Sequence, residues 1–177
     1  YLGHFRHDVK MLRNKAKAGS VVRDWIEKYA EQKAEDFADV LVVSSGFNEA
    51  VLIQWNMFTM QEAKNYWRFL IGMAHTRGQA VLWIPTNHQY GRASDEFHAT
   101  DGLAKMPGDL GADLLDWAPK SESDLCPDRI HNSYTTSYDL AGLILDKVAT
   151  YKKDDNGLSG VSDNTGTDSA VPGEEIG

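Results

Sequence analysis

The order of apolar and polar residues along the chain predicts helices that alternate with strands. Residues 20–36 repeat apolar side chains at helical spacing, and Ser20 is a candidate N-cap. The run "ADVLVVSSG" at 38–46 is rich in valine and ends in small residues, which is typical of a strand buried in a parallel sheet. The apolar face of the first helix comprises Val22, Trp25, Ile26 and Tyr29.

The clearest helix is predicted next, at residues 59–77. Thr59 and Glu62 form a capping box at its start, and Gly78 ends it. "AVLWIPT" at 80–86 predicts a second buried strand, which Pro85 interrupts. The apolar face of the helix comprises Ala63, Tyr66, Trp67, Leu70, Ile71 and Ala74.

The second half of the chain is more polar and predicts fewer elements. A long polar stretch at 87–108 contains "NHQYGRAS" and "MPGD", and a short helical piece is expected at about 109–117. A final helix is expected at about 136–151. Its core face comprises Leu140, Leu143, Ile144, Val148 and Tyr151.

This alternation predicts an α/β fold, namely a three-layer α/β/α sandwich of the flavodoxin-like kind with a mainly parallel central sheet. In such sheets binding sites collect at the carboxyl ends of the strands. The turns "NKAKAGS", "SSGFNE" and "IPTNHQYG" therefore lie where chemistry is expected.

Composition sets the domain organisation. A chain of 177 residues suits one domain with a full core. Residues 152–177 hold two lysines and six acidic residues among Gly, Ser, Asp and Thr, which indicates a flexible acidic tail or a linker to a further domain. We expect the folded domain to span 1–151.

Charge and residue types exclude several kinds of partner. The net charge of −8 argues against a mainly electrostatic nucleic-acid binder. No apolar run approaches the roughly 20 residues that span a bilayer, and no leader pattern opens the chain, so we expect a soluble protein without a membrane partner. The single cysteine, Cys126, allows no internal disulfide, and no His or carboxylate spacing suggests a metal site.

The first candidate loop is "KAGSV" at 17–21, between a short strand expected at Asn14–Ala18 and the first helix. Gly19 allows the backbone to approach a ligand closely, and the start of a helix offers free N–H donors. The alternative is a plain strand-to-helix turn.

The second candidate loop is "SSGFNEA" at 44–50, directly after a buried strand. The Asn48 amide there is a candidate donor to a developing oxyanion, together with the Gly19 N–H. Ser44 and Ser45 lack the Gly-x-Ser-x-Gly context of a hydrolase nucleophile. The alternative is that Asn48 caps a helix or forms an Asx-turn.

The third candidate loop is "PDRIHNSY" at 127–134, before the final helix. Asp128 and His131 lie three residues apart, so His131 is a candidate general base whose tautomer Asp128 fixes. The alternative is a surface turn that Asp128 caps, with His131 exposed.

Together the three loops resemble blocks of the SGNH hydrolase family, also called GDSL esterases and lipases. That family carries a Gly-Asp-Ser nucleophile turn, a Gly in a strand-to-helix turn, Gly-x-Asn-Asp after a buried strand, and Asp-x-x-His before the last helix. The last three blocks are similar to "NKAKAGSVVRDW", "LVVSSGFNE" and "PDRIHNSYTTSYDLAG" here, in the same order, over roughly residues 1–150.

The chain departs from the family pattern at two points. Glu49 stands where the family usually has Asp, at a position that the resemblance implies is largely structural. No Gly-Asp-Ser occurs in the 177 residues. Either the nucleophile lies a few residues upstream of Tyr1, with the first strand, or the domain has lost it; we favour the first.

The resemblance implies a serine esterase for acyl esters, including O-acetylated carbohydrates, that needs no cofactor. It implies Asp128 and His131 as the catalytic pair, and Gly19 and Asn48 as oxyanion donors. Gly46 and Tyr90 are the candidate substrate-binding residues, and we expect Trp83 and the 87–108 stretch to shape the pocket. The implied partner is a small-molecule or glycan ester.

Two other functions stay open. One is a non-catalytic SGNH-like module that binds glycans or joins a larger protein through its tail and an upstream segment. The other is a flavodoxin-like binding domain, which the chain fits less well because it lacks a phosphate-binding Gly-rich loop.

Overall fold

The fold is described from a computed structural model. The structure describes residues 8–11, 13–86, 97, 99–151, 153–154 and 157–158.

A parallel three-stranded sheet forms the centre of the molecule, in the order β1-β2-β3. Strand β1 (Val40–Ser44) pairs with β2 (Ala80–Ile84) over five residues, with Val40 opposite Ala80. Strand β3 (Asp113–Leu114) pairs with β2 through two residues. The two strands predicted at 38–46 and 80–86 are therefore confirmed, with shorter bounds; β2 is buried as expected, whereas Val43 is the only buried residue of β1.

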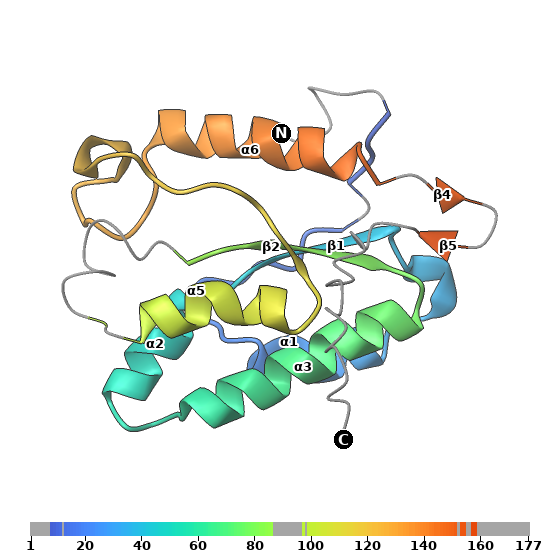
Figure 1. Cartoon of the computed structure of the whole chain (residues 1–177), viewed down its shortest axis with the longest axis horizontal. Coiled ribbons are helices and arrows are strands. Elements are labelled where there is room, and N and C mark those ends of the chain that lie inside the picture. The colour runs from blue at the N-terminus through green and yellow to red at the C-terminus, as the bar shows by residue number, and fades with distance from the viewer. Residues whose placement is uncertain are drawn as a thin grey trace, which may run out of the picture.

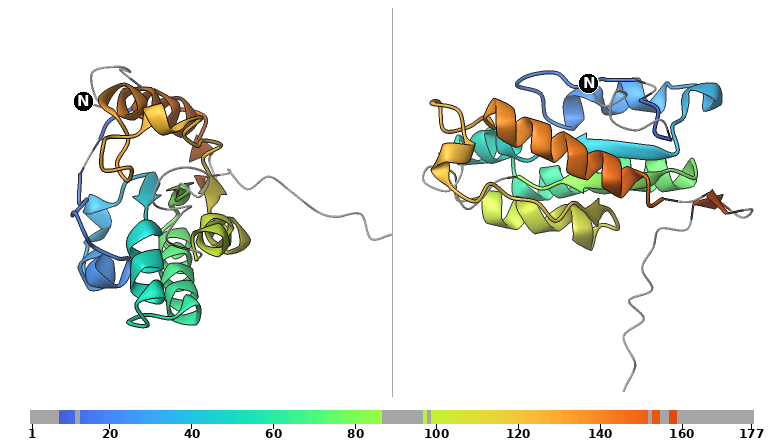
Figure 2. Two further views of the ribbon diagram at one scale, coloured as in Figure 1. Left: turned by 90° about the vertical axis from the view of Figure 1, so that its left-hand side faces the viewer. Right: turned by 90° about the horizontal axis from the view of Figure 1, so that it is seen from above.

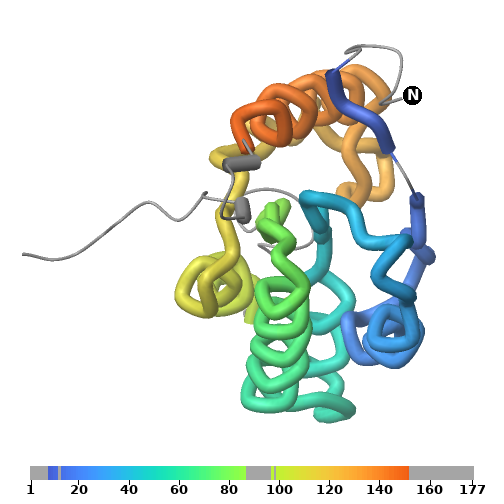
Figure 3. Tube along the Cα trace, turned by 90° about the vertical axis from the view of Figure 1, so that its right-hand side faces the viewer, coloured from blue at the N-terminus to red at the C-terminus, as the bar shows by residue number. Residues whose placement is uncertain are grey.

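Helices cover both faces of this sheet, as the predicted three-layer α/β fold requires (Figure 1). Figure 2 shows α6 on one face, while α1, α2, α3 and α5 lie on the other. Figure 3 shows the same layering from the opposite end of the molecule. The helices are α1 (Arg23–Ala30), α2 (Phe47–Gln54), α3 (Met60–Thr76), α5 (Thr100–Asp109) and α6 (Tyr134–Val148).

Alternate residues of β2 supply the cores on the two faces, because successive side chains of a strand point to opposite sides. Val81 and Trp83 join the core beneath α1, α3 and α5, which is built around the fully buried Trp67. Leu82 and Ile84 join the smaller core beneath α6. The strand is thus buried on both faces, which explains its continuous apolar run.

Helix α3 confirms the prediction at 59–77 most closely. The Thr59 side chain accepts a hydrogen bond from the Glu62 N–H, and the Glu62 carboxylate accepts one from the Thr59 N–H at 2.7 Å. Beyond the helix, Gly78 has a φ of +70°, a left-handed conformation that suits glycine.

The prediction at 20–36 is correct for a helix but wrong about its extent and its cap. The structure has α1 and then a short 3-10 helix, η2 (Ala34–Asp36). Ser20 does not cap α1; its hydroxyl donates to the Lys17 carbonyl at 2.7 Å. The N-cap is Val22, and residues 14–18 form no strand.

The prediction of a helical piece at 109–117 is wrong. Helix α5 ends at Asp109, and β3 follows after Gly111, whose φ is +96°. Pro107 and Gly108 favoured a loop in the sequence, yet they lie in the last turn of α5. A proline there removes only one hydrogen bond of the helix, and the buried Pro107 ring packs into the core.

The final helix was predicted at about 136–151 and is observed as α6, which starts earlier and ends earlier. Ser133 is its N-cap and accepts a hydrogen bond from the Thr136 N–H. Leu143 was expected in the core but is 43% exposed, whereas Leu145 is buried. After α6, residues 149–151 form a turn. Two strands of two residues each follow and pair with each other, β4 (Lys153–Asp154) and β5 (Gly157–Leu158).

Candidate active site

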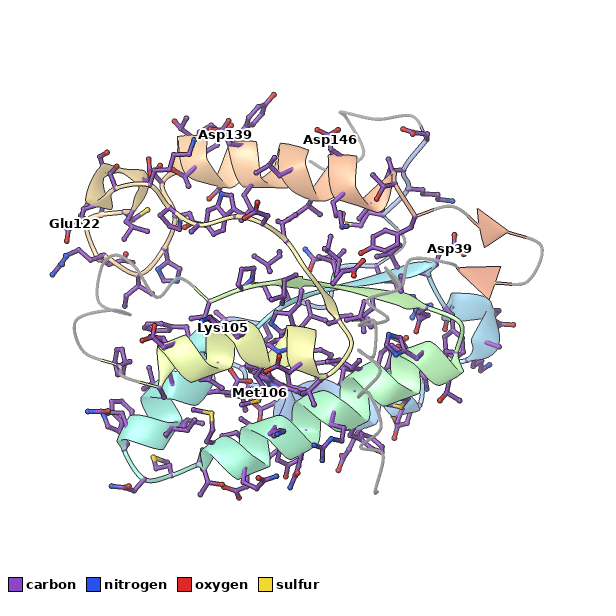
Figure 4. The ribbon with its side chains drawn as sticks, in the orientation of Figure 1. Asp39, Lys105, Met106, Glu122, Asp139 and Asp146 are labelled. Atoms are coloured by element: carbon purple, nitrogen blue, oxygen red, sulfur yellow. The ribbon has the colours of Figure 1, made fainter. Side chains whose placement is uncertain are left out.

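The candidate loops gather at one end of the sheet. Strands β1 and β2 run in the same direction. The loop before α6 lies at their carboxyl end and contains a short 3-10 helix, η3 (Glu122–Asp124) (Figure 1). Glu122 marks this end in Figure 4, whereas Asp39, which precedes β1, lies at the opposite end. Functional groups of parallel sheets collect at such a carboxyl edge.

Asp128 and His131 form the most defined polar contact at this end. The His131 Nδ1 lies 2.6 Å from Asp128 Oδ2. Asp128 Oδ1 accepts hydrogen bonds from the backbone N–H groups of Ile130 and His131, at 2.9 and 3.0 Å. The three-residue spacing therefore folds into a turn in which one carboxylate holds both the backbone and the imidazole.

The loop around this contact is held by its own backbone. The Cys126 N–H donates to the His131 carbonyl at 2.7 Å, and the Ser133 N–H donates to the Asp124 carbonyl at 2.8 Å. Arg129 has a φ of +58° at the turn and pairs with Glu122 at 2.7 Å. Cys126 is half-buried and its thiol donates to the Asn132 carbonyl.

The electrostatics of the contact favour an ionised carboxylate. The hydrogen bond from His131, with those from the two backbone N–H groups, lowers the pKa of Asp128 to about 2. Both side chains face solvent, at 45% exposure for Asp128 and 75% for His131. An Nδ1 that donates to a carboxylate leaves Nε2 as the proton acceptor of the ring, the arrangement that a general base needs.

Gly19 and Asn48 lie in neighbouring segments that contact each other. The Asn48 side-chain nitrogen donates to the carbonyl of Ser20 at 2.9 Å, which fastens the residue after Gly19 to the first turn of α2. An amide nitrogen carries two N–H donors, and this bond uses one. Gly19 has a φ of +72° and no heavy atom of a neighbour within 4 Å of an added Cβ.

Gly46 has a structural requirement that the sequence did not reveal. Its φ is +136°, and an added Cβ would lie 1.9 Å from the Thr86 hydroxyl oxygen. The Thr86 hydroxyl donates to the Ser45 carbonyl at 3.1 Å, so the ends of β1 and β2 meet here without room for a side chain. Gly46 is needed for this close approach whatever its part in substrate binding.

Of the two aromatic residues expected at the substrate pocket, one is buried in the core and the other is not described by the structure. Trp83 does not line a pocket: it is fully buried, packs against Trp67 with ring centroids 4.8 Å apart, and donates to the Ser45 carbonyl. Tyr90 lies outside the described residues, as do the rest of 87–96 and residue 98.

Sequence reasoning missed helix α2 and underestimated Glu49 within it. Glu49 is 1% exposed, and its carboxylate accepts hydrogen bonds from several segments near Gly19 and Asn48. A glutamate three residues after a glycine that follows a strand was the available signal, because that spacing matches the acidic position of a capping box.

Within the part of the chain that the structure describes, no group of three or more His, Cys, Asp or Glu side chains is arranged to hold a metal ion. Among the same residues, no helix combines the length and apolar character needed to cross a membrane.

Comparison with known proteins finds likeness only at the level of structure. No family model and no curated protein matches the sequence. The fold is similar to Axe2, an acetyl xylan esterase from Geobacillus stearothermophilus, with a TM-score of 0.63 at 16% identity over 76% of this chain and 71% of that one. It is also similar to LAE5, an alpha/beta hydrolase enzyme from the metagenome of Lake Arreo, with a TM-score of 0.60 at 13% identity over 77% and 71% of the two chains.

Solved structures of Axe2 include catalytic mutants in which a serine, an aspartate or a histidine is replaced by alanine. In that protein the aspartate lies three residues before the histidine, and the serine comes much earlier. At these identities the likeness is one of fold. The chain therefore has an α/β fold with a parallel sheet that it shares with these esterase and hydrolase structures.

Proposed function

We propose that this chain is an SGNH-like serine ester hydrolase in which His131 is the general base and Asp128 orients it. The observation that carries the proposal is the 2.6 Å contact between Asp128 and the His131 Nδ1, in the loop at the carboxyl end of the parallel sheet. A carboxylate on Nδ1 leaves Nε2 free to accept a proton from a serine.

The spacing of catalytic residues in Axe2 supports this assignment. Its aspartate and histidine are three residues apart, as Asp128 and His131 are here, on a similar fold. Its serine belongs to a part of the chain well upstream of that pair. The order of the SGNH-like blocks in this sequence agrees with that arrangement.

The proposed reaction has two steps. A serine oxygen attacks the ester carbonyl carbon while its proton moves to the His131 Nε2; the tetrahedral intermediate then collapses, and the alcohol leaves with that proton. Water, activated by the same nitrogen, then hydrolyses the acyl-serine. The serine N–H, the Gly19 N–H and the second N–H of Asn48 would stabilise the oxyanion, each contributing about 3 kcal/mol.

The nucleophile is proposed to come from a segment upstream of Tyr1 that adds a strand beside β1. Among the described residues, β1 pairs only with β2, yet its sequence "VLVVS" has none of the proline, lysine or bulge that natural edge strands carry. Leu41 and Val43 face the larger core and Val40 the smaller one, so Val42 faces the α6 side, where it is 40% exposed.

Helix α6 supports the same location for the added strand. The Lys147 ammonium lies 3.8 Å from Asp113 of β3, so this side of α6 faces β3. Tyr138 lies nine residues earlier, about half a turn around the helix, and thus faces the β1 side. Its 51% exposure and that of Val42 leave apolar surface next to the outer edge of β1.

The proposed substrates are acyl esters, with O-acetylated carbohydrates as the first class to test. The support is the SGNH-like pattern and the similarity of fold to an acetyl xylan esterase. Gly46 and Tyr90 are proposed to contact the substrate. The acidic segment 152–177 is proposed to act as a tail or linker and not as part of the site.

The test compares the 177-residue chain with a version extended upstream, on p-nitrophenyl acetate and on acetylated xylo-oligosaccharide. We expect hydrolysis by the extended protein and little or none by the shorter chain. An extended protein that has the upstream Gly-Asp-Ser but hydrolyses neither substrate would refute the proposed function. Binding of the oligosaccharide without hydrolysis would favour the non-catalytic module instead.

A further inference from the structure

Glu49 is a buried residue whose carboxylate accepts hydrogen bonds from an unusually large number of donors. Its side chain is 1% exposed and lies at the third position of α2, where it accepts the Gly46 N–H at 2.9 Å. A capping box requires only that the glutamate at the third helical position accept a hydrogen bond from the backbone N–H of the N-cap residue. The equivalent residue of α3, Glu62, is exposed, and among the described residues its carboxylate accepts hydrogen bonds from Thr59, with the Arg23 charge acting on it through space.

The carboxylate of Glu49 reaches three further groups. The Ser45 hydroxyl lies 2.8 Å from Oε1 and 3.0 Å from Oε2. The Val22 N–H donates to Oε1 at 3.0 Å, and the Trp67 indole N–H lies 3.4 Å from the same oxygen. Glu49 thus joins the start of α1, the turn after β1 and the buried face of α3.

The segment that Glu49 holds is the one that carries Gly19. The Val22 N–H is bound by Glu49, and the Ser20 carbonyl is bound by the adjacent Asn48 at 2.9 Å. Two neighbouring residues of α2 therefore fix the 19–22 segment at two points. The separation between the Gly19 N–H and the Asn48 amide depends on both bonds.

We propose that Glu49 is a positioning residue whose carboxylate sets the distance between the Gly19 and Asn48 donors. This inference rests on the proposed function, in which these donors stabilise one oxyanion. Such donors act only within about 2.7–3.1 Å of the oxyanion. A displacement of about 1 Å costs on the order of 100-fold in rate.

The variant that isolates this role is Glu49→Gln. Glutamine has nearly the same shape but replaces one acceptor oxygen with an NH₂ group, which cannot accept a hydrogen bond. Either the Val22 or the Gly46 N–H then loses its acceptor. The matched control is Glu62→Gln, which makes the same change in the exposed capping box of α3.

Two measurements test the proposal. In ¹H–¹⁵N spectra of the 177-residue chain, Glu49→Gln should displace the Gly19 and Ser20 amide resonances, which lie far from residue 49 in sequence, and Glu62→Gln should leave them unchanged. In the upstream-extended protein, Glu49→Gln should lower kcat about 100-fold with KM nearly unchanged. Glu62→Gln should keep the wild-type kcat.

The outcomes separate this inference from the proposed function. Gly19 and Ser20 resonances that stay at their wild-type positions in Glu49→Gln would overturn the positioning role, whether or not the extended protein is an esterase. A wild-type extended protein without hydrolase activity would overturn the function, while the spectra would still decide whether Glu49 holds the Gly19 segment.

A milder variant keeps the test decisive if Glu49→Gln does not fold. Ser45→Ala removes one side-chain donor to Glu49 and leaves the backbone donors in place. It should displace the same amide resonances by a smaller amount and lower kcat several-fold. Unchanged resonances and an unchanged kcat in this variant would contradict the proposal.

Discussion

At the scale of single residues, the side chains of the candidate site are set by local hydrogen bonds. Asp128 binds two backbone N–H groups of its own turn and also the imidazole of His131, so the same carboxylate stabilises the turn and orients the ring. The structure shows the features of the surface-turn interpretation, since Asp128 caps the turn and both side chains are exposed. The catalytic role of the pair stays a proposal.

The first prediction concerns the titration of Asp128. Its carboxyl should titrate near pH 2 in the folded protein, below the ordinary value of 3.8, because the hydrogen bonds stabilise the charged form. The stability that these bonds give is therefore present above about pH 3.8 and is lost as the pH falls toward 2. Carboxyl ¹³C chemical shifts followed against pH measure this midpoint.

The control for that titration is His131→Ala. Because the His131 hydrogen bond is the largest cause of the lowered pKa, the Asp128 midpoint should rise in this variant while the backbone bonds keep it below 3.8. An Asp128 midpoint at the ordinary value in the wild-type protein would show that the contact does not persist in solution.

The second prediction concerns Gly46. Gly46→Ala should destabilise the protein by about 2 kcal/mol or more, since it combines an unfavourable φ with a contact of 1.9 Å to the Thr86 hydroxyl. Gly19→Ala has a positive φ but open space, and should cost about 1 kcal/mol. Urea unfolding measures both, and equal losses would contradict the steric explanation.

At the scale of elements, strongly periodic segments were predictable and short or irregular ones were not. Helix α3 and strands β1 and β2 follow from capping residues and apolar runs, which are local signals. Helix α2 has apolar residues on most of its sides, so no helical stripe distinguishes it from a loop. Strand β3 has two residues and exists only through its pairing with β2, which no local pattern encodes.

In the candidate site, too, contacts between residues close in sequence were predictable and contacts between distant segments were not. The Asp128 and His131 contact followed from a three-residue spacing before a helix. The buried role of Glu49 did not, because two of its four donors, the Val22 N–H and the Trp67 indole, come from distant segments and meet it only in the folded chain. The 1.9 Å restriction at Gly46 likewise depends on Thr86, which lies forty residues later.

The third prediction uses two neighbouring residues of β1 to test its outer edge, where the described part of the chain shows no paired strand. Val42→Lys should change the stability of the 177-residue chain by no more than about 0.5 kcal/mol, because Val42 is 40% exposed. Val43→Lys should cost about 3 kcal/mol or more, because Val43 is 3% exposed and a charge would be buried. Thermal or urea unfolding of both variants measures the difference.

The effect of Val42→Lys on stability should differ between the 177-residue chain and its upstream-extended form. If an upstream strand covers Val42, Val42→Lys should strongly destabilise the extended protein while the 177-residue chain tolerates it. Equal tolerance in both forms would contradict the proposed location of the added strand.

At the scale of the whole molecule, one end of the sheet carries the candidate chemistry and the opposite end is structural. At the amino end of the strands the Arg77 guanidinium lies 4.4 Å from the ring centroids of Tyr29 and Phe37 and donates to the last carbonyls of α1. Such contacts fix α1, and with it the 19–22 segment, relative to α3.

Tyr151 performs a similar anchoring role at the end of α6. Its hydroxyl donates to Asp113 of β3 at 2.6 Å, and burial together with the Asp113 charge raises the pKa of Tyr151. The last helix is thereby tied to the third strand. The loop with Asp128 and His131 is thus connected to a helix that is fixed at its far end.

The central claim is that His131 is the general base of an ester hydrolase, and its most direct test is the rate of p-nitrophenyl acetate hydrolysis by the upstream-extended His131→Ala protein. We predict a fall in kcat of about 10⁴-fold or more relative to wild type, because a serine without its base is a poor nucleophile, and only a small fall in unfolding temperature from the lost contact with Asp128. A His131→Ala protein that keeps the wild-type kcat would contradict the claim.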